Sequence, residues 1–222
     1  SSSSDSIRCM MMKLISLLSI TASLAAKLEP LPDCQTSPCV LQLRGAVVSD
    51  GATRYRTRGY NGRVPGPTIR TRAGATLRIR LVNALSARDN VNRGHNENSL
   101  PNTTNLHTHG LHVSSTAPAD SIFTVVGPGE SYDYVYEIPH DHMGGTHWYH
   151  PHFHGSTALQ AGGGAAGLLI VEDEPGAIPP EVASMTEVPL LLTMITDEVA
   201  ELQEDFNAVF WSTEPDDFLL IN

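Results

Sequence analysis

The sequence is poor in aromatic residues and in positive charge. Phe, Trp and Tyr make up 6% of the 222 residues, which argues against a stacking surface for single-stranded nucleic acid. Lys and Arg number 14 against 24 Asp and Glu, so the formal net charge is −10, and no Lys or Arg follows Arg93. Nucleic acids are bound largely through cationic contacts to phosphate, so the composition excludes nucleic acid as the expected partner.

Cysteine is also scarce, with three residues in the whole chain. Two of them, Cys34 and Cys39, stand close together in the stretch Cys-Gln-Thr-Ser-Pro-Cys and could form a local disulfide in an oxidising compartment. A metal site built on thiolates would need further cysteines, and none follows Cys39. The sequence therefore excludes a cysteine-based metal cluster.

Long apolar runs are absent except near the N-terminus. Residues 10–26 combine Lys13, a short apolar stretch and a final run of small residues, a pattern typical of a secretory signal peptide and too short for a good membrane span. Residues 1–9 precede the first methionine and are expected to be a non-native leader. We therefore expect a secreted protein without a membrane span. Asn102 begins an acceptor sequon for glycosylation, which fits a secreted protein.

The middle of the chain alternates between apolar and polar residues. In residues 76–83, Leu77, Ile79 and Leu81 share one face, and such alternation indicates a half-buried antiparallel strand. Similar runs separated by Gly- and Pro-rich turns predict an all-β, Greek-key β-sandwich over residues 40–175. The acidic, Pro-containing stretch 172–180 marks a boundary. Residues 176–222 are predicted to be a linker and the truncated start of a second domain, because the chain stops inside an apolar run.

All ten histidines lie between His95 and His154, mainly in two clusters at 107–112 and 147–154. A His-x-His pair on a strand places both imidazoles on one face, roughly 6.5–7 Å apart along the chain. Neutral imidazole is a good ligand for copper, zinc, iron and nickel. Two such pairs on facing strands can converge on a compact metal cluster, and the candidate ligands are His107, His109, His150 and His152.

The other histidines receive no role from the sequence. Strand alternation turns His112 away from the face of His109, whereas His154 shares the face of His150 and His152 and is not excluded by parity. The remaining ones are His95, His140, His142 and His147.

Two other metal-binding folds fit these motifs less well. A cupin also begins with His-x-His but needs a Glu four to six residues later, where this chain has Val113, Ser114 and Ser115. A zinc site like that of carbonic anhydrase uses three histidines and leaves the fourth unexplained.

Four segments, taken together and in order, resemble the first cupredoxin domain of the multicopper oxidases, the laccase and ferroxidase superfamily. They are residues 59–70, 106–110, 145–152 and 165–173. Thr108 stands where the family more usually has an aromatic residue. The resemblance covers about residues 40–175 and implies a cupredoxin-like (plastocyanin-like) sandwich.

The resemblance also implies roles for individual residues. His107 would bind a type 2 copper ion, and His109, His150 and His152 would each bind a type 3 copper ion. Together they would form half of a trinuclear cluster that reduces dioxygen to water. Asp120 falls in the loop where family members carry an acid near the cluster, and it would be a proton relay acting behind the ligands or a simple turn residue.

The sequence departs from the family pattern in what it lacks. The family completes the cluster with four histidines from its last domain and takes electrons through a type 1 copper held by a His-Cys-His stretch, neither of which is present. We therefore expect an N-terminal fragment that is inactive alone. Its partners would be dioxygen, a small reducing substrate such as a phenol or a ferrous or cuprous ion, and a C-terminal cupredoxin domain. The alternatives are a secreted copper-binding module without oxidase activity, and a two-domain oxidase that assembles its cluster between subunits.

Overall fold

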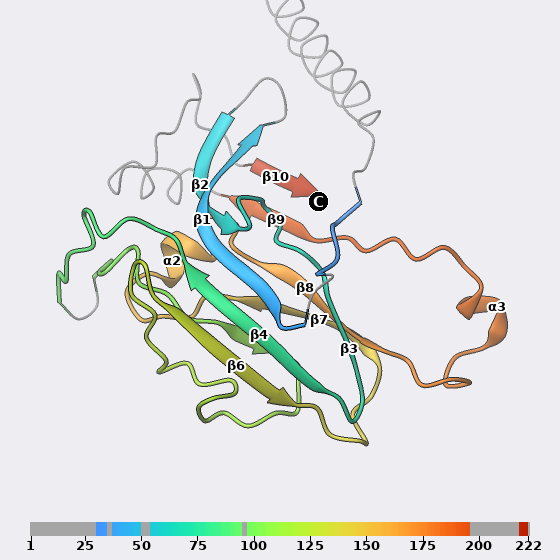
Figure 1. Cartoon of the computed structure of the whole chain (residues 1–222). Helices are drawn as coiled ribbons and strands as arrows, with labels where there is room; N and C mark the ends of the chain where they lie inside the picture. The colour runs from blue at the N-terminus through green and yellow to red at the C-terminus, as the bar shows by residue number, and fades with distance from the viewer. Residues whose placement is uncertain (1–29, 35–36, 50–53, 95–96, 196–217, 222) are drawn as a thin grey trace, which may run out of the picture.

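A computed structural model describes residues 30–34, 37–49, 54–94, 97–195 and 218–221. Two four-stranded sheets pack face to face, as Figure 1 shows, with strand orders β2-β1-β4-β6 and β3-β8-β7-β5. The strands of the two sheets are β1 (Cys39–Ser49), β2 (Arg54–Tyr60), β3 (Ile69–Arg72), β4 (Thr76–Asn83), β5 (His107–His109), β6 (Ser131–Glu137), β7 (Gly145–His150) and β8 (Gly167–Glu172). The all-β sandwich predicted from the alternation is confirmed.

The strand predicted at residues 76–83 is β4, and its burial follows its sequence. Leu77, Ile79 and Leu81 point into the core while the alternate residues Arg78 and Arg80 are exposed. Period-two burial of this kind is what a sheet with one face on the core requires. β4 pairs in parallel with β1 and antiparallel with β6, so it lies at the centre of its sheet.

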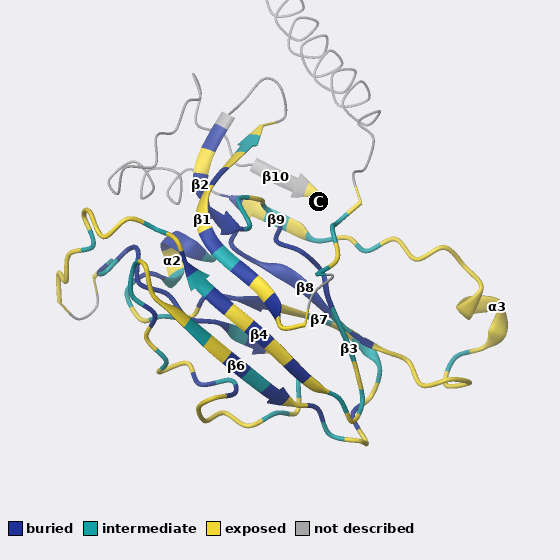
Figure 2. Ribbon diagram, viewed as in Figure 1, coloured by how far each residue is buried: buried dark blue, intermediate teal, exposed yellow. Residues whose placement is uncertain are grey.

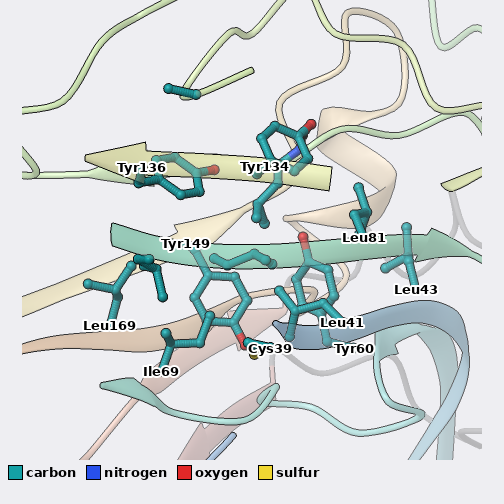
Figure 3. Packing of buried hydrophobic residues seen from close by; sticks show 14 of the residues in the cluster. Cys39, Leu41, Leu43, Tyr60, Ile69, Leu81, Tyr134, Tyr136, Tyr149 and Leu169 are labelled. Carbon is teal, nitrogen blue, oxygen red and sulfur yellow. Dashed lines mark hydrogen bonds between the residues drawn. The ribbon is translucent and has the colours of Figure 1, made fainter. Parts of the chain in front are cut away.

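The core lies between the two sheets, where dark blue residues of both layers meet in Figure 2. Four of its largest fully buried side chains are tyrosines, and Figure 3 shows them among aliphatic residues. They are Tyr60, Tyr134, Tyr136 and Tyr149. Each buried ring removes a large apolar surface from water, which stabilises the packing of the layers. The sandwich is therefore a firm support for the short strands at its edge.

Cys34 and Cys39 form a disulfide, which ties the segment before β1 to the first residue of that strand. Asn102, the sequon residue, is 8% exposed. Its Oδ1 accepts hydrogen bonds from Arg58, and its Nδ2 donates to the carbonyls of Ser86 and Arg88. The amide nitrogen that would carry a glycan is thus used inside the fold, so this sequon is not available for glycosylation in the folded chain.

Two short helices and a separate two-stranded sheet complete the described part of the chain. The helix α2 (Thr157–Gln160) follows the second histidine cluster, and α3 (Pro180–Ala183) lies in the 176–191 segment. β9 (Leu192–Ile195) pairs antiparallel with β10 (Phe218–Ile221). The predicted leader and signal peptide, residues 1–26, and His95 lie outside the described residues. No helix within the described ranges is long and apolar enough to cross a membrane.

Candidate metal centre

The two histidine motifs lie on neighbouring antiparallel strands at the edge of the second sheet. β5 pairs with β7 in a register that sets His107 opposite His150 and His109 opposite Trp148. Because cross-strand partners point to the same face, these four side chains share one face of the strand pair. Thr108 and Tyr149 point to the other face and are buried in the core. The pairing therefore joins two motifs about forty residues apart in the sequence.

Three of the four predicted ligands converge closely. Ligand nitrogens of His107, His109 and His150 all lie within 4.8 Å of one another. The His107 ring lies 4.7 Å from that of His109 and 5.5 Å from that of His150, measured between centroids. His152, beyond the end of β7, lies 5.1 Å from His107 and 5.8 Å from His150 by the same measure. We call these four residues the first histidine group.

The hydrogen bonds of His150 fix which of its nitrogens can bind a metal. Its Nδ1 lies 2.7 Å from the carbonyl of Pro151, which can only accept, so Nδ1 carries the proton. Nε2 then keeps its lone pair, and this atom is buried without a hydrogen-bond partner. Burial lowers the pKa of His150 to about 4, with the neighbouring His107 and His109 acting in the same direction and the bond to Pro151 opposing them. His150 is neutral at physiological pH, as a metal ligand must be.

His107 is oriented in the same way by Asp120. Its Nδ1 lies 3.1 and 3.0 Å from the two carboxylate oxygens, so Nδ1 donates to Asp120 and Nε2 is the nitrogen left to bind a metal. The same carboxylate accepts the backbone N–H of Thr108 at 3.0 Å. Asp120 thus holds both the ring and the backbone of β5, the arrangement by which outer carboxylates orient metal-binding imidazoles.

His109 lies on the open side of the group and stacks on an indole. Trp148 stacks on His109 and on His150, with ring centroids 4.6 and 4.5 Å apart. Burial, followed by the nearby His107, lowers the pKa of His109. Trp148 has no place in the His-x-His motifs, and it is the strand register that sets it across from His109.

A second histidine group lies beyond the other end of the β5–β7 pair and consists of His112, His142 and His147. Its ring centroids are 5.0 Å apart for His112 and His142, and 5.6 Å apart for His142 and His147. His142 accepts the backbone N–H of His112 at Nε2 and therefore donates from Nδ1 to the carbonyl of Met143. His147 hydrogen-bonds to the backbone of His109, and its ring packs against Gly110, whose φ of +86° and close contact leave no room for a Cβ.

The ligand atoms of the second group do not all lie within 4.8 Å of one another. Among the described residues, the one set of three or more histidine, cysteine or acidic side chains whose ligand atoms all lie within 4.8 Å of one another is His107, His109 and His150 of the first group. Both nitrogens of His142 are already used. His140 and His154 are exposed and belong to neither group.

Two features that the motifs did not point to also support the site. Tyr134 accepts the backbone N–H of Leu106 at 3.0 Å, which anchors the residue before the first motif. Asn105 accepts the backbone N–H of His152 at 2.7 Å. Neither has a recognisable sequence signal, because Tyr134 acts from the opposite sheet and Asn105 acts on a segment 47 residues later in the chain.

Comparisons with known proteins point to one family. The sequence profile described as Multicopper oxidase matches residues 44–94 and 95–176. The chain is 30% identical over 136 residues to Multicopper oxidase mco of Staphylococcus haemolyticus, covering 61% of this chain and 26% of that protein. It is 35% identical over 133 residues to Laccase-2 of Thanatephorus cucumeris, covering 58% of this chain and 19% of that protein.

A solved structure agrees with the sequence matches. The laccase-like multi-copper oxidase CueO of Ochrobactrum sp. superposes with a TM-score of 0.55 at 29% identity, covering 75% of this chain and 34% of that one. Other relatives are named L-ascorbate oxidase, from Nicotiana tabacum, and iron transport multicopper oxidase, from Candida albicans, at 32% and 33% identity. The aligned region spans between about a fifth and a quarter of the length of the sequence relatives described above.

Proposed function

Because the chain belongs to the multicopper oxidase family, we propose that it is the N-terminal copper-binding part of an oxidase. The complete enzyme would couple the one-electron oxidation of a small substrate to the four-electron reduction of dioxygen to water. Copper is the metal of the family, and bound copper supplies the change of oxidation state that this reaction needs. We assign His107 to a type 2 copper, and His109, His150 and His152 to type 3 copper ions of a trinuclear cluster.

One observation carries this assignment: the buried Nε2 of His150 has no hydrogen-bond partner, and a ring nitrogen of His150 lies within 4.8 Å of ring nitrogens of His107 and His109. A buried lone pair left unpaired costs free energy. Three imidazoles gathered in one place would each gain a strong partner on binding copper, so the donor set fits the metal. His152 extends this set from the side of His107.

Asp120 has two tasks in this proposal. Its carboxylate holds the Nδ1 proton of His107, which keeps Nε2 directed towards the metal. Its side chain is 11% exposed, so a carboxylate close to the ligands retains contact with solvent. Asp120 would therefore have a second role as a relay that passes protons towards the site where dioxygen is reduced. Its first role, positioning, acts through the ring of His107.

The chain supplies only part of the proposed enzyme. We propose that residues 40–175 form the first cupredoxin-like domain and that residues 176–222 form the linker and start of a second. The other four histidines of the cluster and the type 1 copper site, which takes electrons from substrate, would come from a later domain. The relatives' names include laccase, ascorbate oxidase and iron transport oxidase, so the reducing substrate is expected to be a phenol, a related organic reductant, or a ferrous or cuprous ion. Residues 10–26 would direct the protein to the secretory pathway.

The experiment that tests the proposal has two parts. Copper is titrated into the purified chain, and bound Cu(II) is counted and examined by electron paramagnetic resonance; we expect binding with imidazole nitrogen couplings. Oxygen uptake with phenols or ferrous iron is then measured and expected to be absent. Substrate-dependent uptake by this chain would contradict the division of the active site. A reading frame that ends after Asn222 would instead favour a copper-binding module without oxidase activity.

A further inference from the structure

Asn105 lies two residues before His107, at the point where the chain enters β5. Its side chain is completely buried. The Oδ1 atom accepts the backbone N–H of His152 at 2.7 Å, and the Nδ2 atom donates to the carbonyl of Ile122 at 2.7 Å. Because one partner can only donate and the other can only accept, the two ends of the amide cannot be exchanged.

These two bonds join three segments around the first histidine group: the start of β5, the segment that carries His152, and the loop that carries Asp120 and Ile122. The β5–β7 pairing ends at His107 and His150, so His152 lies beyond the last paired residue. Asn105 holds the backbone of His152 at this point, where the sheet no longer does. Ile122 follows Asp120 by two residues, and Asp120 holds the ring of His107.

We propose that Asn105 is a positioning residue of the copper site, which sets His152 at its place beside His107. The inference rests on the proposed function, because it matters only if both histidines bind copper. Asn105 does not touch the metal in this account. It fixes the relative position of two ligands that come from different motifs, and its hydrogen bond replaces the backbone pairing that β5 is too short to supply. Supporting residues of this kind typically change metal affinity by about 10–100-fold when lost.

Asn83 provides a matched control for a purely structural role. It is equally buried, its Nδ2 donates to the carbonyls of Asn102 and Val126 at 2.7 and 2.9 Å, and its Oδ1 accepts the N–H of Leu85 at 3.1 Å. None of these partners belongs to the histidine motifs. Asn83→Ala should therefore weaken the fold as Asn105→Ala does, but leave the copper ligands in place.

The first readout needs no metal. In the metal-free chain, nuclear Overhauser contacts are measured between the imidazole protons of His107 and His152, whose ring centroids lie 5.1 Å apart. We expect these contacts in the wild type and in Asn83→Ala, and their loss in Asn105→Ala. Asn105→Asp keeps an acceptor for the His152 N–H, so it should keep the contacts even if the alanine variant fails to fold.

The second readout is the Cu(II) dissociation constant of the same proteins. Asn105→Ala should weaken binding by about tenfold or more, Asn105→Asp by about threefold, and Asn83→Ala by less than about twofold. Equal effects of the two alanine variants, or contacts retained in Asn105→Ala, would overturn the role of Asn105. A wild-type chain that shows the contacts but binds no copper would refute the proposed function itself, so the two failures are distinguishable.

Discussion

The two histidine groups of this chain are built from the same stretch of sequence but offer different chemistry. In the first group, His107 and His150 each donate a hydrogen bond from Nδ1, which leaves Nε2 as the nitrogen that can bind a metal. In the second group, His142 uses both of its nitrogens for backbone partners. His147 bonds to the backbone of His109, and so supports a residue of the first group. Some ring centroids are at similar distances in the two groups, but the ligand nitrogens of three histidines all lie within 4.8 Å of one another in the first group and not in the second.

His150 and His142 also differ in how their nitrogen lone pairs are used. A carboxylate or carbonyl that accepts at Nδ1 leaves the opposite nitrogen available to a metal. An imidazole that instead accepts a backbone N–H becomes part of the fold, because its lone pair is already used. His142 is used in this way, whereas Nε2 of His147 is buried without a hydrogen-bond partner, as is that of His150. We therefore propose the metal site for the first group because three of its ligand nitrogens converge, and a supporting role for His142.

The largest expected effect separates the two groups by copper affinity. His150→Ala removes a proposed ligand whose Nε2 is buried and unpaired, and should weaken Cu(II) binding by about 100-fold or more, the upper end of what loss of a supporting residue costs. His112→Ala is the matched control, because His112 contributes its backbone N–H and not its ring to the bond with His142. Isothermal titration should show less than about a twofold change for His112→Ala. Equal losses would erase the distinction between the groups.

The next effect is on stability and comes from the second group. His142→Leu leaves the backbone N–H of His112 without its acceptor, which should lower the free energy of unfolding by about 2 kcal/mol. Copper affinity of the folded variant should stay within about twofold of the wild type, since both ring nitrogens of His142 are used in the fold. His142→Gln, which can again accept at that position, should recover part of the stability in urea unfolding. A large loss of copper affinity with unchanged stability would show that His142 is a ligand after all.

A smaller effect concerns the carboxylate behind His107. Asp120→Ala removes the acceptor that fixes the Nδ1 proton, so copper affinity should fall by about tenfold. Asp120→Asn retains an acceptor oxygen and should lose less. Asp133→Ala, at an exposed ion pair with Arg80, serves as the control for loss of one negative charge. If Asp133→Ala weakened copper binding as much as Asp120→Ala, the effect would be one of net charge and not of orientation.

The sequence predicted much of the sandwich because the signals are local. Alternation within β4 is a property of eight consecutive residues, and it is confirmed by their burial. The short helix α2 escaped prediction because four residues cannot show a helical period. The alternation argument does not apply to His112 and His154, because both lie outside the strands: β5 ends at His109 and β7 ends at His150.

The candidate site was predictable in its residue types but not in its supports. His-x-His spacing indicated which rings could lie together, and three of the four do so in the structure. The ligand roles of all four histidines stay predictions. The contacts of Asn105 and Trp148 depend on the pairing of β5 with β7, which are far apart in the sequence. The division of the histidines into two groups depends on the same pairing. Such pairings are set by the packing of the whole sandwich, and no local pattern encodes them.

The most direct measurement is a long-range proton–nitrogen spectrum of the histidine rings while Cu(I), which is diamagnetic, is added to the metal-free chain. We predict that the Nε2 signals of His107 and His150 shift, together with ring signals of His109 and His152, and that the ring signals of His142 stay in place. Shifts concentrated on His142 and His147, or no shift in the first group, would contradict the assignment of the copper site.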